Sequence, residues 1–269
     1  MPGEMFEMQE GGDSGARAAC GPSATVSEIF TSIQGEGRWV GRKMIFVRFA
    51  GCNLDCAYCD TRRAAVSRGV LERLPGSGVI EYVDSEFSAS RLAAVVKSLP
   101  TPASPCHAVS LTGGEPLMAG AAFINAFART VRESGVPIHL ETNGTLPDVL
   151  SEVIDCVDYT SMDIKVESAT GQPPRYEENR RFLCACARKE CCVKVVFVPE
   201  TRREEIARAA DVVAGVDPSI PFILQPATPA GRVKHRPAPA LMFSLYDVAS
   251  GRLKDVRVIP QTHRLLHVR

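Results

Sequence analysis

Three cysteines lie close together in the segment FAGCNLDCAYCDT, residues 49–61. Cys52, Cys56 and Cys59 have the spacing C-x3-C-x2-C, and no fourth cysteine stands beside them. A structural zinc site closes with four ligands, usually as two C-x2-C pairs separated by a longer stretch. Three thiolates on a four-iron four-sulfur (4Fe-4S) cluster instead leave one iron open to a small-molecule cofactor. The spacing therefore favours such a cluster, with a zinc site or three simply buried thiols as the alternatives.

Apolar runs alternate with helical segments along the chain. Residues 88–99 have helical spacing behind a Ser88 cap, and Thr201 and Glu204 have capping-box spacing at the start of a helix that ends near Gly215. This alternation predicts an α/β fold with a parallel sheet covered by helices, either open or curled into a full or partial barrel. We expect its strands at residues 44–49, 107–111, 137–142, 157–164, 192–198, 221–225 and 254–260.

Residues suited to chemistry follow these predicted strands. In parallel sheets ligands bind at the carboxyl ends of the strands. We therefore expect one converging site. Its members at or just past a strand end are Cys52, Thr112 to Glu115, Glu141 to Gly144, Asp163 to Lys165, Gln225 and Gln261.

Composition limits the partners. The 269 residues are 45% hydrophobic, and 31 basic residues balance 31 acidic ones, so no positive field favours nucleic acid or an acidic membrane surface. No apolar run is long enough for a membrane span, and the start lacks a signal-peptide core, which predicts a cytoplasmic protein with a small-molecule partner. Residues 1–24, rich in Gly, Ser and Ala, are expected to form a flexible tail before a single domain at 25–269.

Two motifs together resemble the radical S-adenosylmethionine (radical SAM) superfamily. An aromatic residue, Tyr58, precedes the last cysteine of the trio, and LTGGEP at 111–116 matches the superfamily's glycine-rich strand end. The resemblance implies a partial or modified (β/α)6 TIM-like barrel. It also implies S-adenosylmethionine chelated to the open iron of a 4Fe-4S cluster on Cys52, Cys56 and Cys59, and its reductive cleavage to a 5′-deoxyadenosyl radical.

A narrower resemblance covers nearly the whole chain after the tail. Residues 28–61, ETNGT at 141–145, VKVVF at 193–197, LQPAT at 224–228 and VIPQTHRLLH at 258–267 are similar to 7-carboxy-7-deazaguanine synthases. This similarity implies conversion of 6-carboxy-5,6,7,8-tetrahydropterin to 7-carboxy-7-deazaguanine with loss of ammonia, a step toward queuosine or archaeosine. It further implies Mg²⁺ as a cofactor, a homodimer, and a flavodoxin or ferredoxin as electron donor.

Arg48 lies in an apolar strand, on the same face as Phe46 because side chains alternate. A charged side chain there needs a partner. The resemblance implies that the partner is the substrate carboxylate, which a guanidinium can grip with two hydrogen bonds. An internal ion pair with Glu36 or Glu115 is the alternative.

The resemblance assigns further roles at the substrate. Arg48, Thr112 and Lys165 are expected to act in catalysis. An exposed Gln34 amide beside glycine would suit the donor and acceptor edge of a pterin, whereas an ordinary glycine-rich turn is the alternative. His263 would be an acid or base, although a lone histidine is more often structural. The substrate contacts implied are Ile33, Gln34, Gly35, Arg48, Thr112, Gln261 and His263.

Other residues are implied to hold the cofactors. The Thr61 hydroxyl would bind Mg²⁺, a hard cation that prefers oxygen, unless Asp60 and Thr61 only cap a following helix. Gly114 would let S-adenosylmethionine approach the backbone, and Lys194 could instead extend to solvent from a sheet edge. The cofactor contacts implied are Tyr58, Asp60, Gly114, Glu115, Glu141, Thr142, Asn143, Asp163, Lys165, Lys194 and Gln225.

Four more cysteines occur in CACARKECC, residues 184–192. Cys184 and Cys186 are two apart on an expected helix, and Cys191 and Cys192 alternate across a strand, so neither pair shares a face. We expect buried small apolar residues rather than a second cluster. Two other functions stay open from sequence: a glycyl-radical-enzyme activating protein of the same superfamily, and a non-enzymatic zinc or iron-sulfur scaffold.

Overall fold

The computed structural model describes residues 21–59, 66–100 and 105–269. Within these residues one eleven-stranded sheet has the order β11-β10-β9-β8-β7-β6-β2-β1-β3-β4, with β5 paired to β1. Seven of the described strands run parallel, and they confirm the predicted strands to within two residues at each end. They are β2 (Lys43–Phe49), β6 (Ala108–Gly113), β7 (Ile138–Thr142), β8 (Tyr159–Asp163), β9 (Glu190–Phe197), β10 (Phe222–Pro226) and β11 (Val256–Val258).

The sequence analysis did not predict the strands on the other side of β2. β1 (Ser23–Ile33) is antiparallel to β2 and parallel to β3 (Arg68–Leu71), which pairs with β4 (Glu81–Asp84). The start of β1 also pairs with β5 (Glu86–Ser88), Ser23 opposite Ser88. Because of this ladder the first strand begins two residues inside the predicted tail.

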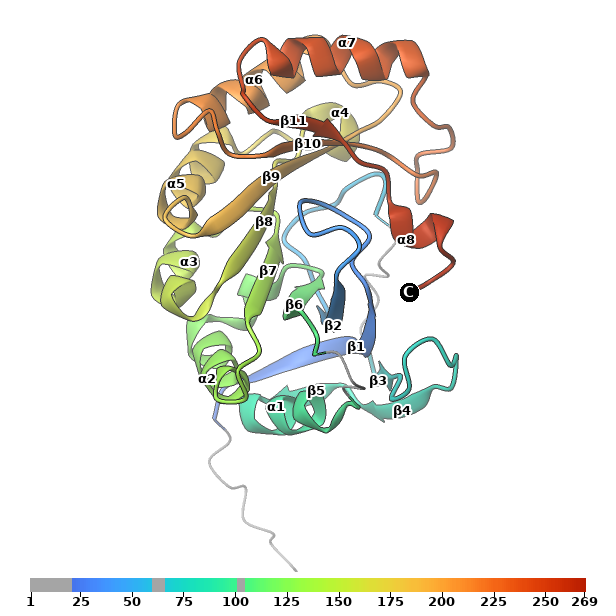
Figure 1. Cartoon of the computed structure of the whole chain (residues 1–269), viewed down its shortest axis with the longest axis vertical. Helices are drawn as coiled ribbons and strands as arrows, with labels where there is room; N and C mark the ends of the chain where they lie inside the picture. Colours follow the sequence, from blue (N-terminus) through green and yellow to red (C-terminus); the bar gives the residue numbers. More distant parts are fainter. Residues whose placement is uncertain (1–20, 60–65, 101–104) are drawn as a thin grey trace, which may run out of the picture.

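Helices cover the outer face of the curved sheet, and β4 and β11 form its two open edges, so the sheet is a partial barrel as predicted (Figure 1). None of the described helices is long and apolar enough to cross a membrane. The helices are α1 (Ala89–Ser98), α2 (Ala121–Arg132), α3 (Pro147–Val153), α4 (Glu167–Thr170), α5 (Tyr176–Cys186), α6 (Arg203–Ala214), α7 (Pro239–Ser250) and α8 (Thr262–Leu265), with 3₁₀ turns η1 (Pro116–Ala119) and η2 (Ile154–Cys156).

Helix ends test the capping predictions. The Ser88 hydroxyl accepts a hydrogen bond from the Arg91 backbone N–H, which confirms the cap of α1. The capping box predicted for Thr201 and Glu204 is wrong by one residue: the Glu205 carboxylate accepts from the backbone N–H of Arg202 at 2.8 Å. Glu205 is buried and also accepts from the Ser168 backbone N–H at 2.8 Å, so a tertiary contact selects it over the exposed Glu204. Gly215 caps the other end of α6, as predicted.

Alternation along the strands separates a helix-covered core from the concave face of the sheet. On β2, Val47 and Phe49 belong to the core beneath the helices, while Phe46 belongs to a smaller apolar cluster on the concave face. Toward the carboxyl ends of the strands the concave positions become polar. They are Arg48, Thr112, Glu141, Asp163, Lys194 and Gln225, each two residues beyond another concave-facing side chain. This change along each strand positions the site.

Candidate active site

A cavity opens at the carboxyl ends of the parallel strands, on the concave side of the sheet. Most of the residues predicted from sequence line it, contributed by β1, β2, the cysteine loop, five further strands and the C-terminal segment. They are Ile33, Gln34, Gly35, Arg48, Cys52, Cys56, Tyr58, Cys59, Thr112, Gly114, Glu141, Thr142, Asn143, Asp163, Lys165, Lys194, Gln225, Gln261 and His263. Asp60 and Thr61 lie outside the described residues. The fold thus brings the predicted residues together, while their individual binding roles remain predictions.

The cysteine loop leaves β2 through Gly51, whose φ of +83° favours glycine. A Cβ atom on Gly114 would lie 1.6 Å from the carbonyl oxygen of Gly51. The Gly114 and Glu115 backbone N–H groups donate to the carbonyls of Phe49 (2.9 Å) and Gly51 (2.8 Å). Gly114 lines the cavity, and the Gly51 carbonyl fills the place that a side chain would take, so the backbone contact between the two segments requires glycine. The predicted approach of a cofactor to the Gly114 backbone stays a prediction.

The three thiols fit an iron-sulfur cluster. Cys52, Cys56 and Cys59 form no disulfide within the described residues and line the same cavity, and Cys52 Sγ accepts from the Leu54 backbone N–H at 3.4 Å. Among the described residues no three Cys, His, Asp or Glu side chains are arranged to hold a single metal ion. Three thiols on one short loop suit a polynuclear cluster better than tetrahedral zinc, which takes four ligands. Burial raises the pKa of the Cys52 and Cys56 thiols, an effect that a coordinating metal opposes.

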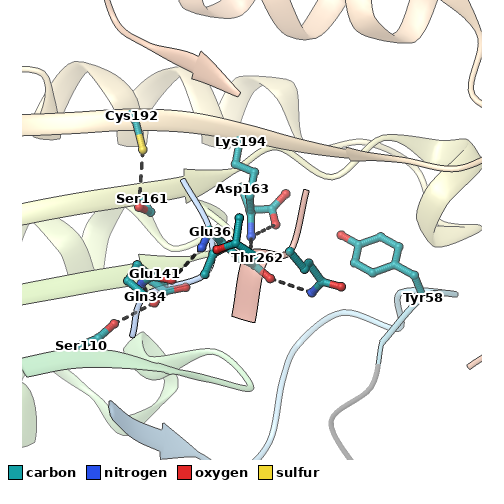
Figure 2. A network of polar contacts seen from close by, with 12 residues as sticks. Gln34, Glu36, Tyr58, Ser110, Glu141, Ser161, Asp163, Cys192, Lys194 and Thr262 are labelled. Carbon is teal, nitrogen blue, oxygen red and sulfur yellow. Dashed lines mark hydrogen bonds and ion pairs between the residues drawn. The ribbon is translucent and has the colours of Figure 1, made fainter. Parts of the chain in front are cut away.

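A chain of ion pairs crosses the cavity wall. Lys194 pairs with both Glu36 and Asp163 (Figure 2). Lys165 Nζ lies 2.7 Å from Asp163 Oδ2 and 2.7 Å from the Tyr58 hydroxyl. Lys194 is only 12% exposed at its side chain and lies on β9 between two other strands, so the alternative of an edge residue that reaches solvent is excluded.

Burial and pairing act in opposite directions on these charges. Burial alone favours neutral forms. The paired carboxylates nevertheless raise the pKa of Lys165 and of Lys194 above the usual lysine value. For Glu36, burial is again the largest effect, but the attraction of Lys194 and hydrogen bonds from Lys194 and Gln261 lower its pKa to about 2. The wall is therefore charged near neutral pH before any ligand binds.

Glu115 lies behind the cavity wall rather than on it. Its side chain is 1% exposed and accepts hydrogen bonds from the Thr142 hydroxyl (2.8 Å) and the backbone N–H groups of Asn143 (2.8 Å) and Leu117 (3.2 Å). Burial raises the pKa of this carboxyl. Glu115 thus accepts from nearby donors and orients Thr142 and Asn143, which line the cavity, while its contact with a cofactor stays a prediction.

Arg48 faces the cavity as alternation predicts, and its internal partner is neither Glu36 nor Glu115. Its Nε lies 3.2 Å from Glu28 Oε2 and its guanidinium stacks over the Phe30 ring at 5.6 Å. The angle to Glu28 leaves Nε buried without a hydrogen-bond acceptor in the described part of the chain. Asp163 Oδ1 and Gln225 Oε1 are likewise buried and without a donor there. Such atoms are normally satisfied by a ligand or water.

The C-terminal segment packs on the turn after β1. A Cβ atom on Gly35 would lie 2.1 Å from His263 Nδ1, and the Thr262 backbone N–H donates to the Gly35 carbonyl at 2.9 Å. Gln34 is buried, not exposed as predicted: its amide donates to Glu141 Oε1 at 2.9 Å and accepts from the Glu36 backbone N–H at 3.0 Å. The packing of His263 against Gly35 explains why position 35 is glycine, and a ligand is not needed to explain it.

Sequence reasoning missed Arg269 as a cavity residue. Arg269 lines the cavity, pairs with Glu28 at 2.7 Å and stacks over Phe30, a contact between positions 241 residues apart that no local pattern signals. Among the later cysteines, Cys186, Cys191 and Cys192 are buried as predicted, whereas Cys184 is exposed because it lies on another face of α5.

Comparison with known proteins decides the family. Residues 46–210 match the Radical SAM superfamily. A 7-carboxy-7-deazaguanine synthase from Geobacter sulfurreducens is 38% identical over 248 residues, which cover 91% of this chain and 98% of the relative. The chain belongs to the 7-carboxy-7-deazaguanine synthase family. A second family member, from Methanothermobacter thermautotrophicus, is 34% identical over 266 residues, covering 91% of this chain and 98% of that protein.

A solved structure shares the fold. The crystal structure of QueE from Escherichia coli superposes with a TM-score of 0.56 at 19% identity, covering 89% of this chain and 94% of that one. At that identity the likeness supports the partial barrel alone. As a radical SAM protein the chain uses a 4Fe-4S cluster and S-adenosylmethionine, and the cavity supplies the three thiols that hold the cluster.

Proposed function

We propose that the chain converts 6-carboxy-5,6,7,8-tetrahydropterin to 7-carboxy-7-deazaguanine with release of ammonia, a step toward 7-deazapurines such as queuosine or archaeosine. One observation carries the proposal. The cluster thiols share a single cavity with a buried guanidinium Nε and two buried acceptor oxygens, on Arg48, Asp163 and Gln225, that have no hydrogen-bond partner among the described residues. Relatives with the synthase name match almost end to end.

The cluster and S-adenosylmethionine, when bound, supply an organic radical by reductive cleavage of a sulfonium carbon–sulfur bond. The chain's own groups hold the substrate. The Arg48 Nε is close to Glu28 but makes no hydrogen bond within the described residues, so the guanidinium has donors for the substrate carboxylate, which a planar guanidinium binds through two parallel hydrogen bonds. Thr112 lies beside Arg48 in the strand register and contributes a hydroxyl to the same wall.

Lys165 acts as a fixed cation rather than as a base. Its Nζ donates to Asp163 and to the Tyr58 hydroxyl, and Asp163 raises the pKa of the lysine against the opposing effect of burial. A lysine that stays protonated near neutral pH can donate hydrogen bonds to a ligand but cannot accept a proton. The unpaired oxygens of Asp163 and Gln225 accept hydrogen bonds from ligand N–H or O–H groups.

Further parts of the proposal concern Mg²⁺, partners and location. We propose Mg²⁺ at the substrate carboxylate with Thr61 as its protein ligand, a homodimer, a flavodoxin or ferredoxin as electron donor, and a cytoplasmic location. The hard-cation preference for oxygen supports the role of the hydroxyl. Thr61→Ala should weaken the dependence of turnover on Mg²⁺, and an unchanged Mg²⁺ titration would count against this ligand.

The direct test incubates anaerobically reconstituted protein with reductant, S-adenosylmethionine, Mg²⁺ and 6-carboxytetrahydropterin. We expect 7-carboxy-7-deazaguanine and ammonia in equal amounts, detected by mass spectrometry. Cys56→Ala, which removes one cluster ligand, should give no product. A cluster-loaded protein that cleaves S-adenosylmethionine but leaves the pterin unchanged would contradict the proposed substrate and bring back the activating-protein alternative.

A further inference from the structure

A row of buried polar side chains lies beneath the cavity, one on each of four neighbouring strands. Its members are Ser110 on β6, His139 on β7, Ser161 on β8 and Cys192 on β9. Ser110, His139 and Cys192 are completely buried, and Ser161 is 8% exposed. The proposed function gives these four residues no role. Polar groups at this depth are costly unless they hydrogen-bond, so their partners matter.

Each neighbour in the row is within hydrogen-bonding distance. His139 Nδ1 lies 3.1 Å from Ser110 Oγ, and His139 Nε2 lies 3.0 Å from Ser161 Oγ. At the far end Cys192 Sγ is 3.5 Å from Ser161 Oγ. At the near end Ser110 Oγ donates to Glu141 Oε1 at 2.8 Å, and Figure 2 shows both ends of the row. The row therefore connects the interior with a carboxylate of the cavity wall.

The donor and acceptor capacities of the four side chains allow one order of donation along the row. A carboxylate only accepts, so the single hydroxyl hydrogen of Ser110 points to Glu141. Ser110 Oγ must then accept from His139, which places the imidazole proton on Nδ1. Burial lowers the pKa of His139 to about 4, so the ring is neutral near pH 7 and its Nε2 accepts. Ser161 donates to Nε2 and in turn accepts from the Cys192 thiol.

Ser110, at one end of the row, donates a hydrogen bond to Oε1 of Glu141. Oε1 accepts from both Ser110 Oγ (2.8 Å) and the Gln34 amide (2.9 Å). Oε2 makes no hydrogen bond within the residues that the structure describes, and Glu141 lines the cavity. Two donors on one oxygen fix the rotation of the carboxylate. The other oxygen is left to a ligand.

We propose that Ser110, His139 and Ser161 form a positioning row that holds His139 as its Nδ1–H tautomer and thereby turns Glu141 Oε2 toward N–H donors of the bound heterocycle. The inference rests on the proposed function only for the identity of that heterocycle. Ser110, His139 and Ser161 are positioning residues, because they act through Glu141. Of the three, only Ser161 also reaches the cavity lining. The same interactions explain why a histidine is tolerated in an apolar strand between Ile138 and Leu140.

The tautomer is the first test and does not depend on turnover. The cluster-loaded protein, labelled with ¹⁵N-histidine, contains five histidines, and His139→Asn identifies the signal of interest. We expect a neutral ring protonated at Nδ1, the tautomer that a solvated histidine disfavours. A ring protonated at Nε2, or an imidazolium at pH 7, overturns the proposal even if the protein makes the expected product.

Kinetics with matched variants is the second test. Ser110→Ala removes the donor to Glu141 and should raise KM for the pterin about tenfold with a smaller change in kcat, as expected for one hydrogen bond to a charged group. Thr160→Val is the control, because Thr160 is buried on the same sheet and its hydroxyl has no partner among the described residues. Equal KM values for the two variants contradict the positioning role.

Variants of His139 separate positioning from simple packing. An Asn amide at position 139 can donate from near the place of Nδ1, so His139→Asn should keep KM within about threefold of the wild type, whereas His139→Leu should resemble Ser110→Ala. An unchanged KM in His139→Leu, or an equal rise in KM in His139→Leu and His139→Asn, contradicts the positioning role of the row. If Ser110→Ala does not fold, Ser161→Ala provides the alternative, because it should change the tautomer ratio without touching Glu141.

Discussion

A Cβ atom on Gly114 would lie 1.6 Å from the carbonyl oxygen of Gly51, so the glycine-rich strand end and the cysteine loop are in direct backbone contact. The contact is reinforced by the hydrogen bond of 2.8 Å from the Glu115 N–H to the same carbonyl. Two segments that are separate motifs in the sequence are thus one structural unit at the cavity.

Gly114→Ala should therefore displace the cysteine loop and reduce cluster retention several-fold. Iron and sulfide analysis after anaerobic reconstitution measures how much cluster the variant retains. Gly251→Ala is the matched control, because its new Cβ would make only ordinary contacts, 3.5 Å from the nearest atom, at a helix end. Full iron content in Gly114→Ala would show that the loop does not depend on this contact.

Lys194→Met should destabilise the fold by about 3–5 kcal/mol, the usual cost of removing one partner of a buried ion pair, because it leaves Glu36 without its cation. Denaturant unfolding measures the change. The double variant with Glu36→Gln should lose less than the sum of the single losses, since the two residues are coupled. Arg257→Met, which breaks an exposed pair with Asp255, should change stability by less than about 1 kcal/mol. Strict additivity in the double variant would contradict the pairing.

His139 predicts a specific loss of stability in acid. Its pKa in the fold, about 4, is below the 6.5 of an unperturbed histidine because of burial, opposed by Glu141 and assisted by His107 and Lys194. The folded state therefore favours the neutral ring. Its contribution is complete above about pH 6.5 and is lost as the pH falls toward 4.

The corresponding measurement compares denaturant unfolding at pH 7.5 and pH 4.5. The wild type should lose roughly 2–3 kcal/mol more than His139→Asn between the two values, from the size of the pKa difference. His139→Asn keeps every other titrating group of the wild type, so it is the control for the contribution of His139. The same pH dependence in both proteins would mean that the ring is not held neutral by the fold.

Arg48→Lys tests the substrate carboxylate site. A lysine keeps the positive charge but loses the planar pair of donors, so KM for the pterin should rise at least about tenfold while cluster content is unchanged. Arg68→Lys is the control, because Arg68 also stacks on an aromatic ring, Tyr82, but at an exposed position away from the cavity. A KM within twofold of the wild type in Arg48→Lys would falsify the assignment of Arg48.

Local pattern was enough for much of the fold. The seven parallel strands are apolar runs with period two, and the same period placed Arg48 on the concave face beside Phe46. The Ser88 cap and the cysteine trio are also short-range features, because the groups involved lie within eight residues of one another. The clustering of polar residues at the strand ends follows from parallel topology alone.

Partners across the fold could only come from the tertiary structure. Arg48 pairs with Glu28 because β1 is antiparallel to β2 with these two residues in register, and β1 carries no signal that the sequence analysis recognised. Lys194 meets Glu36 across 158 positions, and the Ser110, His139 and Ser161 row forms because three strands align concave-facing residues at one depth. The sequence alone thus determined the seven parallel strands and the chemistry of the trio. Hydrogen-bond and charge partners depend on register between distant strands, which only the packed sheet decides.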